Sequence, residues 1–248
     1  MDDWQRITHA RSFAAVADTY DRARPSYPDG AVQFMVGSTS RTVVDLGAGT
    51  GALTRLLIAA GHAVIAIDPL LPMLSHLRRR SAGHGPAVLA GAAERIPLRR
   101  ASVDAVTIGQ AYHWFDPDRA LPELARVIKA GGVLSMVWNM RDESVPWVRR
   151  LGTIVGGHTS MQDPSGALGL VGNFGPVQWQ RFRLYQSVDR AGLIDLVRSR
   201  SHVAVLDKSD RDDVLNQVGE LYDRQRGDVL GLQVPYVTHC LRAVRLAD

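Results

Sequence analysis

The fold is decided by residues 43–51, which read Val-Val-Asp-Leu-Gly-Ala-Gly-Thr-Gly. A short β-branched run stops at a glycine cluster, where the chain can turn tightly and a ligand can approach the backbone closely. Residues 52–60 then carry leucines at helical spacing, and a further glycine follows them. The start of such a helix presents unpaired N–H groups toward a ligand. The stretch therefore predicts a site for a nucleotide-like ligand.

Strands and helices alternate along the residues that follow this turn. Further strands are expected at 63–67, 87–90, 103–108 and 133–138, and helices at 72–80 and from Asp116-Pro117 to Gly131. Alternation at this spacing is typical of a parallel sheet with helices on both faces. Two later strands, 177–187 and 232–246, indicate an antiparallel C-terminal edge. We therefore predict an α/β, Rossmann-like fold with a mostly parallel seven-stranded sheet.

Three segments are expected within one domain, and a small second lobe is the alternative. Residues 1–40 are polar and helical in character and form a predicted N-terminal helical cap. Residues 41–141 form the ligand-binding core, and residues 142–248 supply lid helices and C-terminal strands of the same domain. The last segment is expected to contain a glycine-rich loop at 152–175 and helices at about 190–201 and 209–226.

Composition and charge exclude several classes of protein. The chain has 248 residues, 46% hydrophobic and 22% charged, which is ordinary for a globular protein. Its net charge is +4, but the basic clusters are short and separated, which argues against nucleic-acid binding. There is no apolar signal region and no run of about 18 apolar residues, so we expect no membrane association and a cytoplasmic location. A single cysteine and scattered histidines predict neither a disulfide nor a metal site.

Two aspartates flank the predicted ligand site. Asp45 lies two residues before the first glycine, where a carboxylate is a poor neighbour for a pyrophosphate but a good one for the ammonium group of a methionine moiety. Asp68 ends the second strand about 20 residues further on, where it can accept hydrogen bonds from both ribose hydroxyls. The structural alternatives are a turn-forming Asp45 and a helix-capping Asp68. Gly47, Gly49 and Ala52 also match a dinucleotide fingerprint loosely, so an NAD(P)-dependent oxidoreductase stays an alternative.

The order of several motifs resembles the class I S-adenosylmethionine-dependent methyltransferases. The matching stretches are Val44–Gly51, Asp68, Gly91–Glu94, Ile96–Leu98, Ser102–Val106 and Leu124–Gly132. They cover about residues 40–140 of the chain. Tyr20–Pro28 and Gln110–Phe115 are similar to a narrower bacterial group, related to the ubiquinone-pathway and trans-aconitate methyltransferases.

The resemblance implies that S-adenosylmethionine is the cofactor and S-adenosylhomocysteine the product. The implied cofactor-binding residues are Asp45, Gly47, Ala48, Gly49, Gly51, Asp68, Pro69, Ala92, Ala93, Glu94, Gln110 and Tyr20. In such proteins the glycines line the methionine and ribose, the loop at 92–94 covers the adenine, and Gln110 lies under the sulfonium. Tyr20 would belong to a helix that closes over the cofactor. Ala92 replaces an aspartate that many relatives carry, so backbone groups would have to contact the adenine.

The resemblance also predicts methyl transfer to a small-molecule acceptor by in-line displacement. His113 is the candidate base because it follows the fourth strand at the carboxyl edge of the sheet, although packing beside Trp114 is an alternative. Candidate substrate contacts are Arg24, Trp114 and Trp138. Arg24 could grip a carboxylate of the acceptor, or else pair with Asp21 at the surface. A non-catalytic S-adenosylmethionine-binding protein is a further alternative, and a monomer or homodimer is expected.

Overall fold

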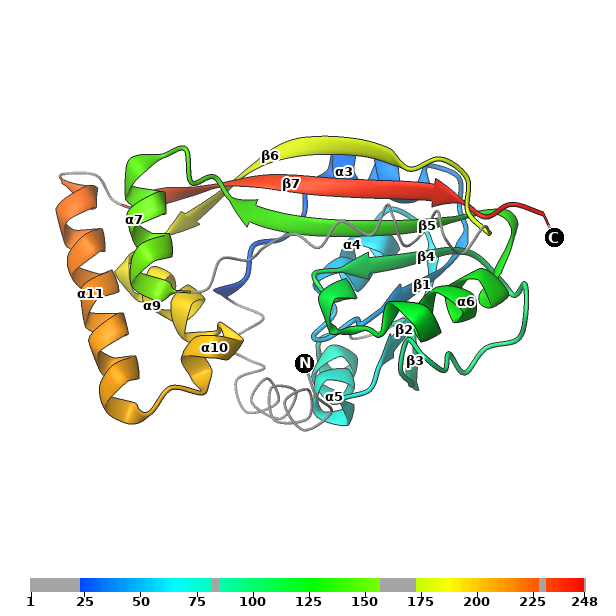
Figure 1. Cartoon of the computed structure of the whole chain (residues 1–248), viewed down its shortest axis with the longest axis horizontal. Helices are drawn as coiled ribbons and strands as arrows, with labels where there is room; N and C mark the ends of the chain where they lie inside the picture. The colour runs from blue at the N-terminus through cyan, green and yellow to red at the C-terminus, as the bar shows by residue number, and fades with distance from the viewer. Residues whose placement is uncertain (1–22, 82–84, 157–172, 228–230, 248) are drawn as a thin grey trace. The chain divides into compact units, whose positions relative to one another are not determined.

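The computed structural model of the chain describes residues 23–81, 85–156, 173–227 and 231–247. Within them, seven strands form one sheet in the order β3-β2-β1-β4-β5-β7-β6 (Figure 1). The strands are β1 (Thr42–Leu46), β2 (Ala63–Asp68), β3 (Ala87–Ala90), β4 (Val103–Gly109), β5 (Ile128–Arg141), β6 (Gln178–Val188) and β7 (Leu232–Val244). The predicted α/β fold with a seven-stranded sheet is confirmed.

The first five strands run parallel, as predicted. β1 pairs with β2 and β4, β2 pairs with β3, and β4 pairs with β5. The chain moves from β1 outward to β3, and then from β4 outward in the opposite direction to β5. Because such crossovers are right-handed, α4 (Ala52–Ala59) and α5 (Leu71–Arg80) cover one face and α6 (Pro117–Val127) covers the other. α3 (Asp29–Val36) packs beside α4.

β7 runs antiparallel to β5 at the edge of the sheet. The N–H of Gly131 donates to the carbonyl of Arg245, and the N–H of Arg245 donates to the carbonyl of Gly132, both at 2.8 Å. Gly131 and Gly132 thus oppose the single residue Arg245, and Gly131 has a positive φ of 75°, which is the pattern of a β-bulge between antiparallel strands. β6 is the outermost strand, and its arrow in Figure 1 points opposite to that of β7. The predicted antiparallel C-terminal edge is therefore confirmed.

The start of α6 follows the expectation and its end does not. Asp116 caps the helix as predicted, because its carboxylate accepts a hydrogen bond from the N–H of Asp118 at 3.2 Å. The helix ends at Val127, before the expected glycine pair. Ile128 already pairs with Val103 of β4, so the strand begins there. The contact with a neighbouring strand overrides the local stop signal.

Two helices of the last third differ from the expectation. α7 (Pro146–Val155) was not expected, and its C-terminal end extends into the segment 152–175 that was expected to be a loop. It forms because a proline stands in its first turn and its buried face carries Val148 and Leu151. α11 (Lys208–Arg226) begins earlier than Ser209-Asp210, since Asp207 caps it by accepting from the N–H of Asp210 at 2.9 Å.

The described residues form two compact units. The sheet unit comprises those within 26–139, 161–182 and 238–248, and the helical unit comprises those within 1–25, 140–160 and 183–237. The division falls inside β5, β6 and β7, so each unit holds part of these three strands. The segments 1–40, 41–141 and 142–248 that the sequence suggested stay a prediction.

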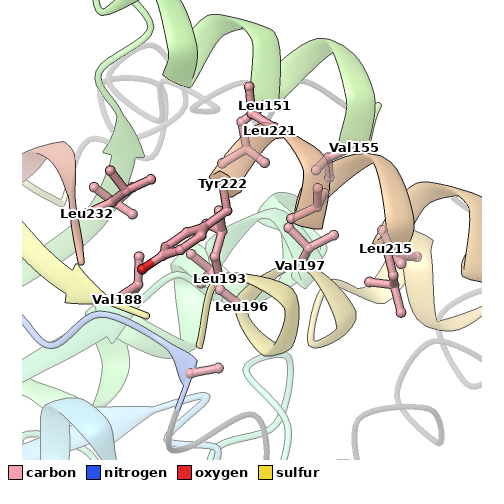
Figure 2. Packing of buried hydrophobic residues seen from close by; sticks show 14 of the residues in the cluster. Leu151, Val155, Val188, Leu193, Leu196, Val197, Leu215, Leu221, Tyr222 and Leu232 are labelled. Atoms are coloured by element: carbon pink, nitrogen blue, oxygen red, sulfur yellow. The ribbon is translucent and has the colours of Figure 1, made fainter. Parts of the chain in front are cut away.

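Each unit has its own apolar core. In the sheet unit, Met35 of α3 and Leu57 of α4 are fully buried in the same cluster as Val43 of β1. The helical unit contains α7, α9 (Arg190–Arg198), α10 (Ser201–Ala204) and α11. Its core residues labelled in Figure 2 are Leu151, Val155, Val188, Leu193, Leu196, Val197, Leu215, Leu221, Tyr222 and Leu232. Among the described helices, none has both the length and the apolar character needed to cross a membrane.

Candidate functional site

The strand order reverses between β1 and β4, so the loops at the carboxyl ends of these strands lead away in opposite directions. Ligands of open α/β sheets bind at this position. The turn after β1 is held to β2, because the N–H groups of Gly47 and Ala48 both donate to the carbonyl of Ile67, at 2.8 and 3.1 Å. The predicted glycine turn therefore lies at the ligand-binding edge of the sheet.

The glycine turn requires glycine for two separate reasons. Gly47, Gly49 and Gly51 have positive φ angles of 72°, 55° and 89°, which L side chains rarely adopt. A Cβ at Gly47 would also lie 2.6 Å from the Cβ of Ala111, so the loop after β4 packs directly on the turn. A Cβ at Gly49 would meet no described atom within 4 Å. A ligand can therefore approach the backbone at Gly49.

Asp45 is a buried acid near the end of β1. Its side chain belongs to a residue that is 1% exposed, and its Oδ2 accepts a hydrogen bond from the hydroxyl of Thr54 at 2.5 Å. Burial raises the pKa of Asp45 to about 7; the Thr54 hydrogen bond opposes this rise, and the negative charge of Asp68 adds to it. A positively charged ligand beside Asp45 would favour its ionised form, so this carboxyl group is suited to a cation.

Asp68 ties the end of β2 to the glycine turn. Its Oδ2 accepts from the N–H of Gly49 at 2.9 Å, and its Oδ1 accepts from the N–H of Leu70 at 2.8 Å. Burial raises the pKa of Asp68, and these two hydrogen bonds oppose the rise. Each carboxylate oxygen has a second lone pair, so the side chain can accept further hydrogen bonds from a ligand. Its bond to Leu70 also helps to start α5.

Gln110 has a strained backbone at the end of β4. Its φ of 55° is unusual for a residue other than glycine. Its N–H donates to the carbonyl of Val137 at 2.9 Å, and its Nε2 donates to the carbonyl of Asn139 at 3.1 Å, both on β5. Strain of this kind persists where neighbouring bonds hold it, and it concentrates at functional sites. The next residue, Ala111, contacts Gly47, so Gln110 and the glycine turn share one edge.

The loop that was expected to cover the adenine follows β3. Ala92 and Arg95 form an isolated antiparallel bridge, and Ala93 between them is 3% exposed. Oε1 of Glu94 accepts a hydrogen bond from the N–H of Asp116 at 2.9 Å. This bond fixes the loop to the start of α6 and gives Glu94 a structural role. The predicted contacts of this loop with a ligand stay predictions.

The other predicted residues lie in different surroundings. His113 is exposed, and its ring centroid lies 5.0 Å from that of Trp114, so aromatic packing and a role as a base both stay open. Trp138 is 2% exposed within the sheet unit, which favours a core role over substrate contact. Arg24 belongs to the helical unit and is half-buried there. Tyr20 lies outside the described residues.

Sequence reasoning missed Thr54, the hydrogen-bond donor to Asp45. Thr54 is fully buried in α4, and its hydroxyl reaches back to the strand that precedes the helix. A threonine among the leucines of the apolar helix face was the available signal. Periodicity alone assigns such a residue to packing, so the acid and its donor could be joined only in three dimensions.

The chain is similar to methyltransferases in sequence and in fold. A family profile described as a methyltransferase domain matches residues 44–136. An uncharacterized methyltransferase of Mycobacterium tuberculosis is 43% identical over 235 residues, covering 94% of this chain and 95% of that protein. A solved structure of a candidate type II methyltransferase from Anaeromyxobacter dehalogenans has a TM-score of 0.68 at 24% identity, covering 91% of this chain and 99% of that one. The last likeness shows a shared fold.

Proposed function

The chain belongs to the S-adenosylmethionine-dependent methyltransferases, and we propose that it holds this cofactor in the sheet unit between Asp45 and Asp68. The observation that carries the proposal is the open side of the glycine turn at Gly49, whose N–H donates to Asp68 and which follows the strand that carries Asp45. The ammonium group of the methionine moiety pairs with Asp45. The ribose hydroxyls donate to the free lone pairs of Asp68.

The two acids fit a sulfonium nucleoside better than a dinucleotide. The pKa of Asp45 is about 7, so a cation beside it offsets the cost of burying its negative charge. Burial also raises the pKa of Asp68. A pyrophosphate at the same turn would add negative charge beside both acids. Electrostatics therefore disfavours the NAD(P)-dependent alternative.

The remaining cofactor contacts extend along the same edge. The glycine turn and its neighbours supply backbone contacts from Gly47, Ala48, Gly51 and Pro69. The loop that contains Ala92, Ala93 and Glu94 contacts the adenine through backbone groups, because Ala92 carries no polar side chain. Gln110 lies under the sulfonium, where its hydrogen bonds to β5 keep its side chain in place.

The chemistry needs alignment more than proton transfer. Bound S-adenosylmethionine would supply a methyl group that the attached sulfonium makes electrophilic, and its transfer to an acceptor lone pair would leave the electrons of the methyl–sulfur bond on sulfur. The protein holds the small-molecule acceptor in line with that bond and excludes water. We assign the acceptor side to the loop after β4, with Trp114 as a contact surface and His113 as the base for an acceptor that must lose a proton.

Calorimetric titration tests the cofactor proposal. S-adenosylhomocysteine should bind and NADH should not. Asp68→Ala should lower the affinity for S-adenosylhomocysteine by about tenfold or more, because buried hydrogen bonds to a charged group are lost. Asp104→Asn is a matched control: Asp104 lies near the start of β4, where its carboxylate accepts from the N–H of Thr42 and from Lys129. Equal affinity of wild type and Asp68→Ala, or binding of NADH in preference, would contradict the proposal.

A labelled methyl group tests turnover separately from binding. The protein is incubated with methyl-labelled S-adenosylmethionine and a broad panel of small metabolites. Label in one of them supports transfer to a small molecule. Cofactor binding without any labelled product favours the non-catalytic alternative.

A further inference from the structure

Three arginines of the helical unit lie within electrostatic reach of one buried tyrosine. Tyr236 of β7 is 3% exposed. Burial raises the pKa of its hydroxyl, and the positive charges of Arg200, Arg141 and Arg24 all oppose that rise. The four side chains therefore lie within electrostatic reach of one another, although they come from distant parts of the chain.

Backbone contacts place Arg141 beside Tyr236. The N–H of Asp142, next to Arg141, donates to the carbonyl of Pro235 at 2.9 Å. Pro235 directly precedes Tyr236, so the last residues of β5 lie beside the first residues of β7. This contact is part of the helical unit and is independent of the sheet unit.

Arg24 joins the group through two further contacts. Its Nη2 donates to the carbonyl of Ser199 at 3.2 Å, and Ser199 directly precedes Arg200. The carbonyl of the residue before Arg24 accepts from Nε2 of Gln186 at 2.8 Å. Oε1 of the same amide accepts from the hydroxyl of Tyr236 at 3.2 Å. Arg24, Arg200 and Tyr236 are thus connected by hydrogen bonds of their own or of adjacent residues.

Arg141 is a buried cation with an unsatisfied donor. Its side chain is 4% exposed, and no described residue accepts a hydrogen bond from its Nη1. Oε1 of Glu143 lies 3.9 Å from its Nη2, which is too far for a hydrogen bond. A guanidinium group keeps its proton in proteins, so burial cannot neutralise it. A buried charge without close compensation is costly, and a bound anion would offset that cost.

His202 is a neighbour of the group but adds no charge to it at neutral pH. Its Nε2 lies 3.2 Å from the carbonyl of Val155. Burial lowers the pKa of His202, and the charge of Arg200 lowers it further, as does that of Arg141. The positive charge of the group therefore comes from the three guanidinium groups.

We propose that Arg24, Arg141 and Arg200 bind a small-molecule oxyanion, a carboxylate or a phosphate, within the helical unit. Planar guanidinium groups suit these anions because two parallel N–H groups can donate to two oxygens. This anion site is a second binding site, separate from the proposed cofactor site of the sheet unit.

Titration with inorganic phosphate and with succinate, at ionic strength held constant with sodium chloride, tests this anion site. The test variant is Arg141→Gln, and the control is Arg150→Gln, since Arg150 is exposed on α7 of the same unit and loses the same charge. At least one of the two anions should bind wild type and the control. Arg141→Gln should lose about tenfold or more in affinity, the loss expected for a charge-assisted bidentate contact. The anion that binds more tightly identifies the ligand's anionic group as phosphate or carboxylate.

The outcomes separate the two proposals. S-adenosylhomocysteine should bind all three proteins equally, and its failure to bind would overturn the cofactor proposal alone. Failure of wild type to bind either anion, or unchanged anion affinity in Arg141→Gln, would overturn the anion site. If that variant does not fold, thermal unfolding of wild type decides: an anion that occupies the site raises the melting temperature above that in chloride, and no increase overturns the inference.

Discussion

Replacement of Asp45 by asparagine removes an acid whose pKa is about 7 in the folded protein, against 3.8 in the ordinary case. Between these pH values the folded state binds one more proton than the unfolded state, so the free energy of unfolding falls as pH rises. Within the range from pH 5 to pH 8, the free energy of unfolding falls between pH 5 and the folded-state pKa of about 7. This interval of about two pH units corresponds to a loss of about 3 kcal/mol. The asparagine side chain has no such proton to lose. Between pH 5 and pH 8, the free energy of unfolding of Asp45→Asn should therefore rise by about 3 kcal/mol relative to that of wild type.

Urea unfolding at several pH values between 5 and 8, followed by circular dichroism, measures this difference. Asp104→Asn is the control, because hydrogen bonds from Lys129 and from the N–H of Thr42 lower the pKa of Asp104. That carboxylate is ionised in both states above pH 5, so its difference from wild type should stay constant. A constant difference for Asp45→Asn as well would refute the assignment of a buried, destabilising acid.

The same acid should make cofactor binding depend on pH. The ammonium group of S-adenosylhomocysteine pairs with the ionised form, and that form is depleted below pH 7. The affinity of wild type should fall about tenfold per pH unit below 7, because binding must displace a proton. Asp45→Asn should bind weakly and without this slope. Calorimetry that gives one affinity for wild type from pH 5.5 to 8 would contradict the pairing of Asp45 with the ammonium group.

Other substitutions test separate parts of the structure. In urea unfolding, Gly47→Ala should destabilise the protein by about 1–3 kcal/mol more than Gly131→Ala. Both glycines have a positive φ, but only a Cβ at Gly47 would meet another Cβ. Equal losses of stability would contradict this contact. Thr54→Val should raise the pKa of Asp45 further and move the pH midpoint of cofactor binding upward. Leu196→Ala should cost about 2–5 kcal/mol, because Leu196 is fully buried in the helical unit. A loss below that range would indicate that this core collapses around the cavity.

The elements of the sheet could be predicted because their signals are local. The parallel strands are short apolar runs that are buried on both faces. The dipeptide Asp116-Pro117 predicts the start of α6. The end of α6 could not be predicted, because Ile128 leaves the helix to pair with Val103, a residue far away in sequence. α7 was missed for a similar reason: its apolar face is recognisable only once α11 packs on it.

The candidate site divides in the same way. Asp45 and Asp68 could be chosen from the sequence because each stands where a strand ends. The strained φ of Gln110 and the hydrogen bond from Thr54 depend on contacts between separate elements. No local pattern predicts the arginine group, because its members come from three separate segments of the chain. No window of sequence contains enough of it to suggest an anion site.

Asp45 and Arg141 are buried groups of opposite charge, and we explain both by the binding of a ligand of the other charge. Asp45 in the sheet unit is buried with its pKa raised to about 7, and Arg141 in the helical unit keeps an unsatisfied Nη1 although Glu143 lies 3.9 Å from its Nη2. Burial of a charge costs stability unless it is closely compensated. Packing alone does not explain either residue, since a neutral side chain of similar size would avoid the cost. A ligand of the right charge offsets this cost. In the two proposals, the ammonium group of the cofactor compensates Asp45 and a small-molecule oxyanion compensates Arg141. The stability that each buried charge costs the folded protein would then be recovered as affinity for its own ligand.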